Sequence, residues 1–494
     1  MTTAATVLPE RYNASLLLDR NLERGLGDKV AIVCGDESVR YADLFARACG
    51  AGAALRDLGV GRGERVLIVM DDCPGLPAVF LGAMRIGAVP VPVNPLYSAD
   101  EYPFFVEDSG ARVAVVDAVC AEKVSAPHVL RVDELGPADD LAPADTPRDD
   151  VAFWLYSSGS TGRPKGVVHL HGDLVATCET YARHVLGITA ADVTFSTTKL
   201  FHAYGLGNNL SFPTWAGATA VLNPGRPSPD AIFSAVARTR PTLFFSVPTL
   251  YNAMLMSEGE GDFSSVRLCL SAAEPLPAEV WHRWHESHGL VILDGIGSTE
   301  MLHIYCSNTV EALKPGSSGR PVPGYDVKLV DDSGDIVNAA GAGDLYVRGP
   351  GMLREYWQQP EKTADCIRDE WFYTRDRYRR DEGGYYWCEG RADDMFKVSG
   401  LWVSPADVEA RLIEHPAIVE TAVIGAQVEG FTKGKAYVVV RQPSLATDEL
   451  ADELRDFCAA KLHRYQVPEL VEFVAGLPKT TTGKIERYKL RLAS

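Results

Sequence analysis

Apolar residues in the first part of the chain alternate between helical and strand spacing. Leu44, Ala48 and Leu55 lie on one side of a predicted helix that closes at the glycine-rich segment 59–63. Short apolar runs bounded by charge, proline or glycine follow it, as is typical of buried strands. The predicted elements are a helix over 41–58, a strand over 65–70, a helix over 76–86, a strand over 88–93 and a strand over 113–116. This alternation is typical of a largely parallel sheet covered by helices, so we predict an α/β fold.

Further along, the pattern indicates a second, smaller unit. Residues 137–150 are rich in Pro, Asp and Ala and predict a loop. The elements predicted near the end are a helix over 405–414, strands over 418–424 and 435–440, a helix over 448–462 and a strand over 470–474. A chain of 494 residues exceeds what one hydrophobic core usually organises. We therefore predict a large N-terminal domain of mixed, mostly parallel sheets covered by helices at 1–392, and a small C-terminal α+β domain at 393–494.

Charge and cysteine usage limit the partners. The formal net charge of -18 disfavours binding to nucleic acid or anionic membranes, because both need a basic face. Any anionic ligand must then be met by local positive charge. The ten cysteines include no Cys-x-x-Cys pair and predict reduced thiols in a cytoplasmic protein. No basic segment followed by an apolar one opens the chain, and the apolar runs are too short to span a membrane.

The segment 156–166, Tyr-Ser-Ser-Gly-Ser-Thr-Gly-Arg-Pro-Lys-Gly, has the composition of a phosphate-binding loop. Its glycines let a ligand approach the backbone, its hydroxyls offer donors, and Arg163 and Lys165 add positive charge. It differs from the common P-loop because Pro164 precedes the lysine and a strand, 167–170, follows it. A surface turn is the alternative for a shorter Gly/Ser run. The predicted binding residues are Ser157, Ser158, Gly159, Ser160, Thr161, Gly162 and Lys165.

A second polar turn, Asp-Gly-Ile-Gly-Ser-Thr-Glu at 294–300, ends in a hydroxyl and a carboxylate. A carboxylate beside a phosphate site is repulsive unless a divalent cation lies between them. Glu300 therefore predicts a Mg²⁺ site.

These strings resemble those of the adenylate-forming enzymes, a superfamily of acyl- and aryl-CoA synthetases, peptide-synthetase adenylation domains and luciferases. The loop at 156–166 is similar to their phosphate loop, and 477–487 is similar to their final motif. The strings at 199–208 and 301–308 are more narrowly similar to the benzoate-CoA ligase group. The resemblance covers nearly the whole chain.

The resemblance implies roles for the nucleotide-binding residues. Thr299 would contact the α-phosphate of ATP, and Glu300 with Thr161 would hold Mg²⁺. Asp376 and Arg391 would bind the ribose. Lysine is usually a solvated surface charge, but the motif around Lys484 makes that residue the predicted catalytic cation, acting with Glu300, Thr161 and Lys165.

It also implies an acid pocket and a CoA path. The implied pocket residues are His202, Ala203, Tyr204, Gly205, Gly297 and His303. His202 would lie at an aromatic gate beside the pantetheine tunnel, although a lone histidine is more often packed in a core. Gly400 would lie near the pantetheine path. Asp393 would be the hinge about which a mobile C-terminal domain rotates, with a solvated turn as the alternative.

Two residues depart from the pattern of the superfamily. Ile296 stands where an aromatic residue often stacks on adenine, so apolar packing is the contact expected there. Arg375 replaces the glycine of a Thr-Gly-Asp motif. Because arginine does not adopt a positive φ cheaply, we expect an ordinary backbone at Arg375 or a displaced segment.

The resemblance implies an ATP-dependent aryl-acid:CoA ligase. It would join a benzoate-like acid to AMP, release pyrophosphate and pass the acyl group to CoA, as a monomer or homodimer. One alternative is an adenylating enzyme that loads a carrier protein. Another is a nucleotide-binding protein without ligase activity, which Ile296 and Arg375 would favour.

Overall fold

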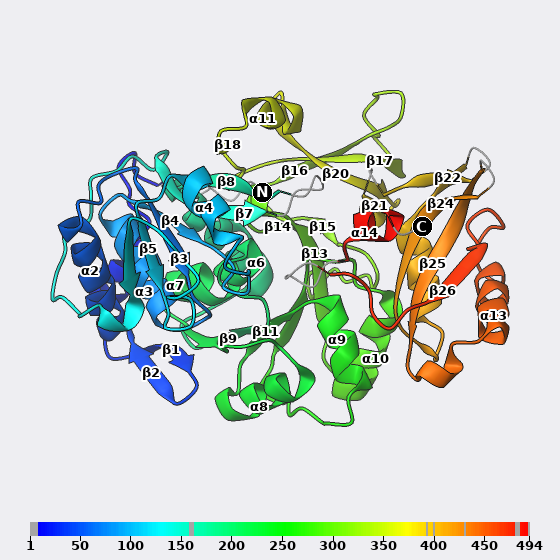
Figure 1. Ribbon diagram of the computed structural model, residues 1–494, viewed down its shortest axis with the longest axis horizontal. Helices are drawn as coiled ribbons and strands as arrows, with labels where there is room; N and C mark the ends of the chain where they lie inside the picture. Colours follow the sequence, from blue (N-terminus) through cyan, green and yellow to red (C-terminus); the bar gives the residue numbers. More distant parts are fainter. Residues whose placement is uncertain are drawn as a thin grey trace.

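The structure is a computed structural model that describes residues 8–157, 163–391, 394–398, 401–428, 431–479 and 485–492. Figure 1 shows its α/β architecture, with sheets and helices through the blue to yellow parts and the orange and red C-terminal elements at one side. The fold class predicted from the sequence is confirmed by this arrangement of mixed sheets covered by helices.

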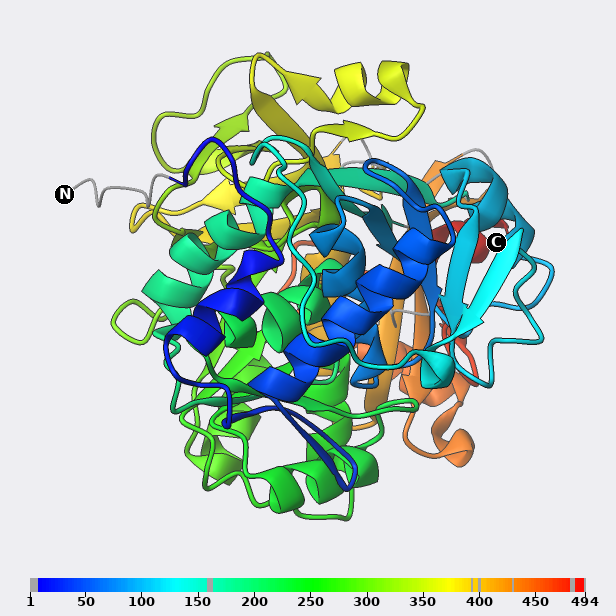
Figure 2. The same ribbon diagram turned by 90° about the vertical axis from the view of Figure 1, so that its left-hand side faces the viewer.

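The N-terminal elements build a parallel sheet of four strands in the described residues. The strands are β3 (Arg65–Val69), β4 (Val89–Pro92), β5 (Val113–Val116) and β6 (His128–Arg131), and the helices are α1 (Leu16–Glu23), α2 (Tyr41–Asp57), α3 (Gly75–Arg85) and α4 (Tyr102–Ser109). Helix α2 crosses the face shown in Figure 2. It packs closely on α3. Gly82 of α3 lies so near the Ala48 carbonyl oxygen of α2 that a Cβ at Gly82 would overlap that oxygen. The predicted alternation of helix and strand is confirmed here.

A larger mixed sheet lies beside the parallel sheet. In the described residues its strand order is β15-β14-β13-β12-β11-β9-β10-β1-β2, parallel from β13 to β1 and antiparallel at both edges. The strands are β1 (Val30–Cys34), β2 (Glu37–Arg40), β9 (Val193–Ser196), β10 (Thr219–Leu222), β11 (Leu243–Ser246), β12 (Leu268–Ser271), β13 (Ile292–Gly297), β14 (Ile304–Ser307) and β15 (Arg320–Pro321). Ligands of such sheets usually bind beyond the carboxyl ends of the parallel strands. The turn that begins at Ser298 occupies that position after β13.

Helices cover both faces of the large sheet. One face carries α8 (Pro229–Thr239), α9 (Pro248–Met256) and α10 (Ala278–His288), whose apolar residues share a core with β9 to β13. The other face carries α5 (His171–Thr177), the π-helices η2 (Cys178–Leu186) and η3 (Gly207–Ser211), α6 (Ala203–Leu206) and α7 (Phe212–Ala216). Strand β11 runs through Pro248 into α9.

Strands β7 (Val151–Ser157) and β8 (Lys165–Leu170) flank the predicted phosphate loop. They are antiparallel, with Ser157 opposite Lys165, and β18 (Glu355–Tyr356) extends the sheet beside β8. The loop at 137–150 leads into β7 as predicted. The strand after the lysine is confirmed, whereas Ser158 to Gly162 lie outside the described residues.

An antiparallel sheet follows, and it carries the predicted ribose residues. Its elements are β16 (Asp326–Val330), β17 (Gly341–Arg348), α11 (Pro360–Cys366), β19 (Ile367–Arg368), β20 (Trp371–Arg380) and β21 (Tyr386–Arg391).

The C-terminal elements have apolar cores of their own. They are β22 (Phe396–Val398), β23 (Leu401–Val403), α12 (Pro405–Ile413), β24 (Ile418–Val428), β25 (Phe431–Val440), α13 (Asp448–Ala459), β26 (Leu470–Phe473) and α14 (Arg487–Leu492). Strands β24 and β25 extend beyond the predicted 418–424 and 435–440, because their polar ends pair through backbone hydrogen bonds that apolar periodicity does not reveal. Asn252 of α9 donates to the Val419 carbonyl oxygen of β24 at 3.2 Å, which places β24 beside α9. None of the helices in the described part of the chain combines the length and apolar character needed to cross a bilayer.

Candidate active site

Lys165 and Glu300 meet in a largely buried ion pair at the centre of the candidate site. Lys165 begins β8, and Glu300 lies in the 3₁₀ turn η4 (Thr299–Met301) after β13. Lys165 Nζ is 3.2 Å from Glu300 Oε1, and the two side chains are 15% and 12% exposed. The Tyr356 hydroxyl donates to the same oxygen at 2.8 Å, and Lys165 Nζ lies 3.8 Å from the centre of the Tyr356 ring. The structure thus joins the predicted phosphate strand to the predicted metal ligand.

Glu300 keeps its negative charge in this environment. Burial alone would raise the pKa of the carboxyl, but the Lys165 ammonium and the Tyr356 hydroxyl outweigh burial and hold the pKa below its ordinary value. The described residues include no cluster of three His, Cys, Asp or Glu side chains that could hold a metal. Mg²⁺ is usually bound by one or two carboxylates together with substrate phosphates, so a single ionised carboxylate suits it. Glu300 fits this requirement, and Thr161 lies outside the described residues.

The turn that carries Thr299 and Glu300 is held from three sides. Ser298 Oγ caps it by accepting from the Met301 N–H at 3.2 Å. The Leu353 N–H donates to the Glu300 carbonyl oxygen at 2.6 Å. His169 Nε2 lies 2.8 Å from the Thr299 carbonyl oxygen. The sequence analysis did not predict a role for His169 or Tyr356. His169 could have been found, because it lies four residues beyond Lys165 and therefore shares the face of β8 that carries Lys165.

Asp376 and Arg391 are brought together by strand pairing. They are direct partners of β20 and β21, with Asp376 Oδ1 3.1 Å from Arg391 Nη1. Arg375 has φ of 62°, so the expectation of an ordinary backbone at this position was wrong. The turn is fixed by a hydrogen bond from the Asp376 N–H to Thr374 Oγ1 at 3.0 Å, while the Arg375 guanidinium lies 5.9 Å from the centre of the Tyr373 ring. Asp376 therefore keeps its pairing with Arg391 despite the unfavourable residue before it.

The predicted gate and pocket segment forms the start of a helix. His202 caps α6 with an extended backbone, and its ring contacts Phe201 with centroids 4.3 Å apart. Ala203 and Tyr204 are buried. A Cβ at Gly205 would overlap the Lys199 carbonyl oxygen, so close backbone packing requires glycine there.

His303 lies against this segment. Its ring is 5.4 Å from that of Tyr204, and its Nε2 is 3.2 Å from Asn208 Oδ1. Burial lowers the pKa of His303 to about 3, so the imidazole is neutral at physiological pH. Gly297 and Gly207 make room for this histidine, because a Cβ at either position would overlap it. The structure thus brings together the predicted pocket residues of α6, β13 and the segment before β14.

Several predicted residues fall outside the described part of the chain. They are Ser158, Gly159, Ser160, Thr161, Gly162, Asp393, Gly400 and Lys484. Ser157 is described as the last residue of β7. Ile296 is partly buried and packs against the core of the large sheet.

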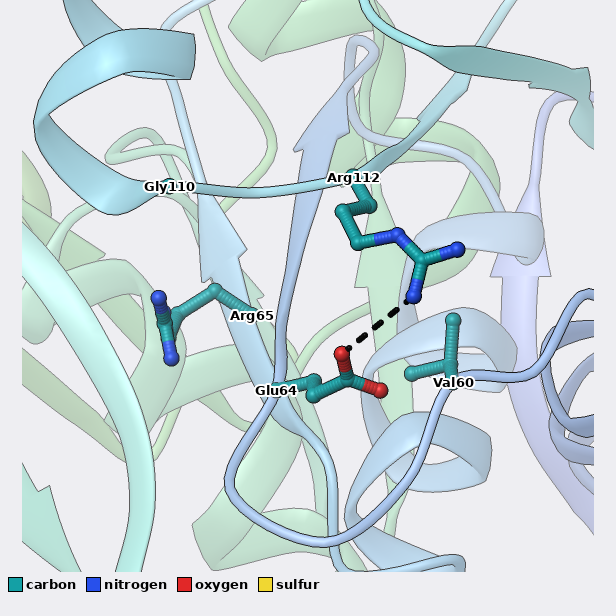
Figure 3. A pocket seen from close by; sticks show the side chains of 5 residues that line it. All are labelled: Val60, Glu64, Arg65, Gly110 and Arg112. Carbon is teal, nitrogen blue, oxygen red and sulfur yellow. Dashed lines mark ion pairs between the residues drawn. The ribbon is translucent and has the colours of Figure 1, made fainter.

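A small cavity of about 40 Å³ lies near the parallel sheet, where Arg112 pairs with Glu64 at 3.6 Å (Figure 3). Figure 3 shows Arg65 pointing away from that pair. Its guanidinium donates to the backbone carbonyl oxygens of Ser109 and Gly63, at 2.6 and 3.0 Å. The cationic groups here are engaged by the protein's own acceptors, which indicates a structural role.

Comparison with known proteins agrees with this geometry. Residues 18–357 match the AMP-binding enzyme family, and residues 407–484 match the AMP-binding enzyme C-terminal domain. The chain therefore belongs to the AMP-binding, adenylate-forming enzymes, as its motifs predicted. Within them it stands near the benzoate–CoA ligase group.

Three relatives support that placement. A benzoate–CoA ligase of Thauera aromatica is 45% identical, with 100% of this chain and 98% of the relative covered. The crystal structure of the anthranilate CoA ligase AuaEII in complex with anthranoyl-AMP has a TM-score of 0.96 and 38% identity, covering 99% of each chain. A benzoate CoA ligase from Burkholderia xenovorans LB400 has a TM-score of 0.91 and 42% identity, covering 97% of this chain and 100% of that one.

Proposed function

We propose that this protein is an ATP-dependent aryl-acid:CoA ligase. It activates a benzoate-like carboxylic acid as the acyl-adenylate, releases pyrophosphate and transfers the acyl group to the thiol of CoA. The proposal is supported above all by the buried Lys165–Glu300 pair, which lies at the ends of two strands in a chain 45% identical to a benzoate–CoA ligase.

The first step joins two anions. A carboxylate oxygen of the acid attacks the α-phosphorus of ATP, the bond to the bridging oxygen breaks, and pyrophosphate leaves. Positive charge placed where negative charge develops lowers the barrier to this step. Lys165 with Thr161 would stabilise the departing pyrophosphate, and Lys484 with the Thr299 hydroxyl would act at the α-phosphate. Glu300 would hold Mg²⁺, which when bound neutralises phosphate charge.

The remaining residues would orient the two substrates. Asp376 and Arg391 would hold the ribose hydroxyls through their carboxylate and guanidinium groups. The neutral His303, with Tyr204 and Ala203, would surround the aromatic ring of the acid. A pocket of aromatic and small apolar side chains suits such a ring.

The second step requires the active site to rearrange. The thiol of CoA attacks the acyl carbon, and AMP leaves with the electrons of the mixed anhydride bond. Lys484 must move away before the thiol arrives, so we propose that residues 393–494 turn about Asp393 and bring Gly400 beside the pantetheine path. The separate apolar cores of the C-terminal elements support this division. The ten free cysteines support a reducing, cytoplasmic setting.

The test is pyrophosphate release measured over a panel of substituted benzoates with ATP, Mg²⁺ and CoA. We expect acid-dependent release from the unaltered protein and a loss of roughly 100-fold or more in Lys484→Ala, the size seen when one group that stabilises developing charge is removed. The substrate assignment fails if no aromatic acid of the panel provokes turnover.

The thiol acceptor is tested separately. Direct competition between CoA and acyl carrier proteins for the adenylate distinguishes a CoA ligase from an enzyme that loads a carrier protein. We expect CoA to be the acceptor. Acylation of a carrier protein in preference to CoA would contradict that assignment.

A further inference from the structure

One face of β8 contacts the Thr299–Glu300 turn through two residues, Lys165 and His169, which lie on either side of Val167 on that face. Side chains of a strand alternate between its faces, so Lys165 and His169 lie on the same face. Lys165 reaches the Glu300 carboxylate, and His169 reaches the Thr299 carbonyl oxygen. Strand β8, which follows the predicted phosphate loop, therefore contacts both Thr299 and Glu300.

The His169 ring is itself held in place. Its side chain is fully buried and stacks on Phe153, with ring centroids 5.2 Å apart and planes 23° from parallel. Its Nδ1 lies 3.4 Å from Asp173 Oδ2, which also accepts from the Leu170 N–H at 2.8 Å. A carbonyl oxygen and a carboxylate oxygen both only accept, so the hydrogen bond to Thr299 needs a proton on His169 Nε2, and the Asp173 contact is a hydrogen bond only in a ring that carries a proton on both nitrogens.

The direction of the Thr299 carbonyl determines the orientation of the whole peptide group between Thr299 and Glu300. The peptide group between Thr299 and Glu300 is planar, so the direction of its C=O determines the direction of the Glu300 N–H. Both Cα atoms lie in that plane, and the side chains of both residues project from it. The same carbonyl oxygen also accepts from the Leu302 N–H at 3.1 Å, within the turn. The imidazole N–H is thus the donor that ties this peptide to β8, and its loss frees the peptide to tilt about the bond within the turn.

We propose that His169 is a positioning residue for the nucleotide half-reaction. Its Nε2–H orients the Thr299–Glu300 peptide, so that the Thr299 hydroxyl points to the α-phosphate and the Glu300 carboxylate to Mg²⁺. The inference rests on the proposed function for those two roles. The contact itself joins residues 130 positions apart and stands on the geometry.

Two variants separate the hydrogen bond from the packing. His169→Phe keeps an aromatic ring on Phe153 and loses the donor, whereas His169→Gln keeps an N–H donor and loses the stacked ring. We expect His169→Phe to raise KM for ATP, and the Mg²⁺ concentration at half-maximal rate, about tenfold, the size expected for one buried hydrogen bond. KM for the aromatic acid should stay within about twofold, and His169→Gln should restore most of the loss.

His171→Phe is the matched control. His171 is buried like His169, but its Nδ1 accepts from the Ala14 N–H at 3.1 Å, away from the turn. We expect His171→Phe to lower the thermal unfolding temperature and to leave KM for ATP unchanged. KM does not depend on the folded fraction, so partial unfolding does not imitate the predicted effect.

The inference is overturned if His169→Phe matches the unaltered protein while His169→Gln is impaired, since packing would then be what matters. It is equally overturned if KM for ATP and KM for the acid rise together. Absence of acid-dependent turnover in the unaltered protein would instead reject the proposed function. In that case the dissociation constant of MgATP, measured in the same three variants, decides whether His169 positions the nucleotide turn.

Discussion

Lys165 and Glu300 balance each other's charge inside the protein, at a separation of 3.2 Å between Nζ and Oε1. Lys165 is the first residue of β8 and Glu300 lies in the 3₁₀ turn after β13, so the pair forms because β8 begins beside that turn. Removal of one partner leaves the other buried and uncompensated, which costs more than the pair itself is worth.

We predict that Lys165→Met destabilises the protein by roughly 3 kcal/mol at pH 7, because Glu300 loses its cation. The pKa of Glu300 is lowered in the folded protein, so its contribution to stability is present above the unfolded pKa and is lost as pH falls through the folded pKa. Without Lys165, burial raises that pKa, and the variant should regain stability as pH falls from 7 to 5.

Urea unfolding of the Lys165→Met/Glu300→Gln double variant is the control. It should recover most of the lost free energy, and a double variant as unstable as the single one would contradict the prediction.

Asp376 should contribute directly to nucleotide affinity. Hydrogen bonds to a charged group are worth about 1.5–3 kcal/mol, so Asp376→Ala should weaken ATP binding by roughly 10- to 100-fold. Titration calorimetry with MgATP measures this. Asp332→Asn is the control: Asp332 lies in the turn after β16 and pairs with Arg377, the neighbour of Asp376 on β20. Unchanged affinity in Asp376→Ala would remove the ribose assignment.

Arg375 is strained, and glycine should relieve the strain. The left-handed backbone conformation costs an L-residue about 1–2 kcal/mol, whereas glycine adopts it freely. With φ of 62° at Arg375, we predict that Arg375→Gly stabilises the protein by about 1 kcal/mol, after the loss of its contact with Tyr373. Arg375→Ala loses the same contact but keeps the Cβ, so it should show no gain. Chemical denaturation measures the unfolding free energy of both variants. Equal unfolding free energies for Arg375→Gly and Arg375→Ala would argue against backbone strain at Arg375.

Local sequence patterns predicted the elements but not how they meet. Apolar runs such as 113–116 predicted buried strands because each residue of those strands is covered on both faces. The contact of His169 with Thr299 joins residues 130 apart, and that of Tyr356 with Glu300 joins residues 56 apart. Periodicity gives the face of a strand, not the element that covers it, so neither contact could be read from the pattern.

At Arg375 the local sequence led to a clear prediction of the backbone conformation, and that prediction was wrong. Residue preference favoured an ordinary backbone, yet strand pairing on either side and the hydrogen bond to Thr374 Oγ1 impose a positive φ. Tertiary pairing outweighed a local cost of about 1–2 kcal/mol. The roles of Lys484, Asp393 and Gly400 stay predictions that depend on the motifs.

Asp294 should make the stability of the protein depend on pH. The Asp294 side chain is buried in the middle of β13, and burial raises its pKa from 3.8 to about 8. The carboxyl is therefore protonated in the folded protein at pH 7 and ionised in the unfolded chain. A raised folded pKa contributes stability that is present below the unfolded pKa and is lost as pH rises through the folded pKa.

We predict that the unfolding free energy falls by up to about 1.4 kcal/mol per pH unit between pH 6 and 8 through this one group. Asp294→Asn, which is neutral and of the same shape, should remove that slope and be the more stable protein at pH 8. Asp28→Asn is the control, because the Asp28 side chain is fully exposed, and its pH profile should run parallel to that of the unaltered protein. Urea unfolding at pH 6, 7 and 8 measures all three. Parallel profiles for Asp294→Asn and the unaltered protein would mean that Asp294 ionises in the fold without cost, which its burial on β13 argues against.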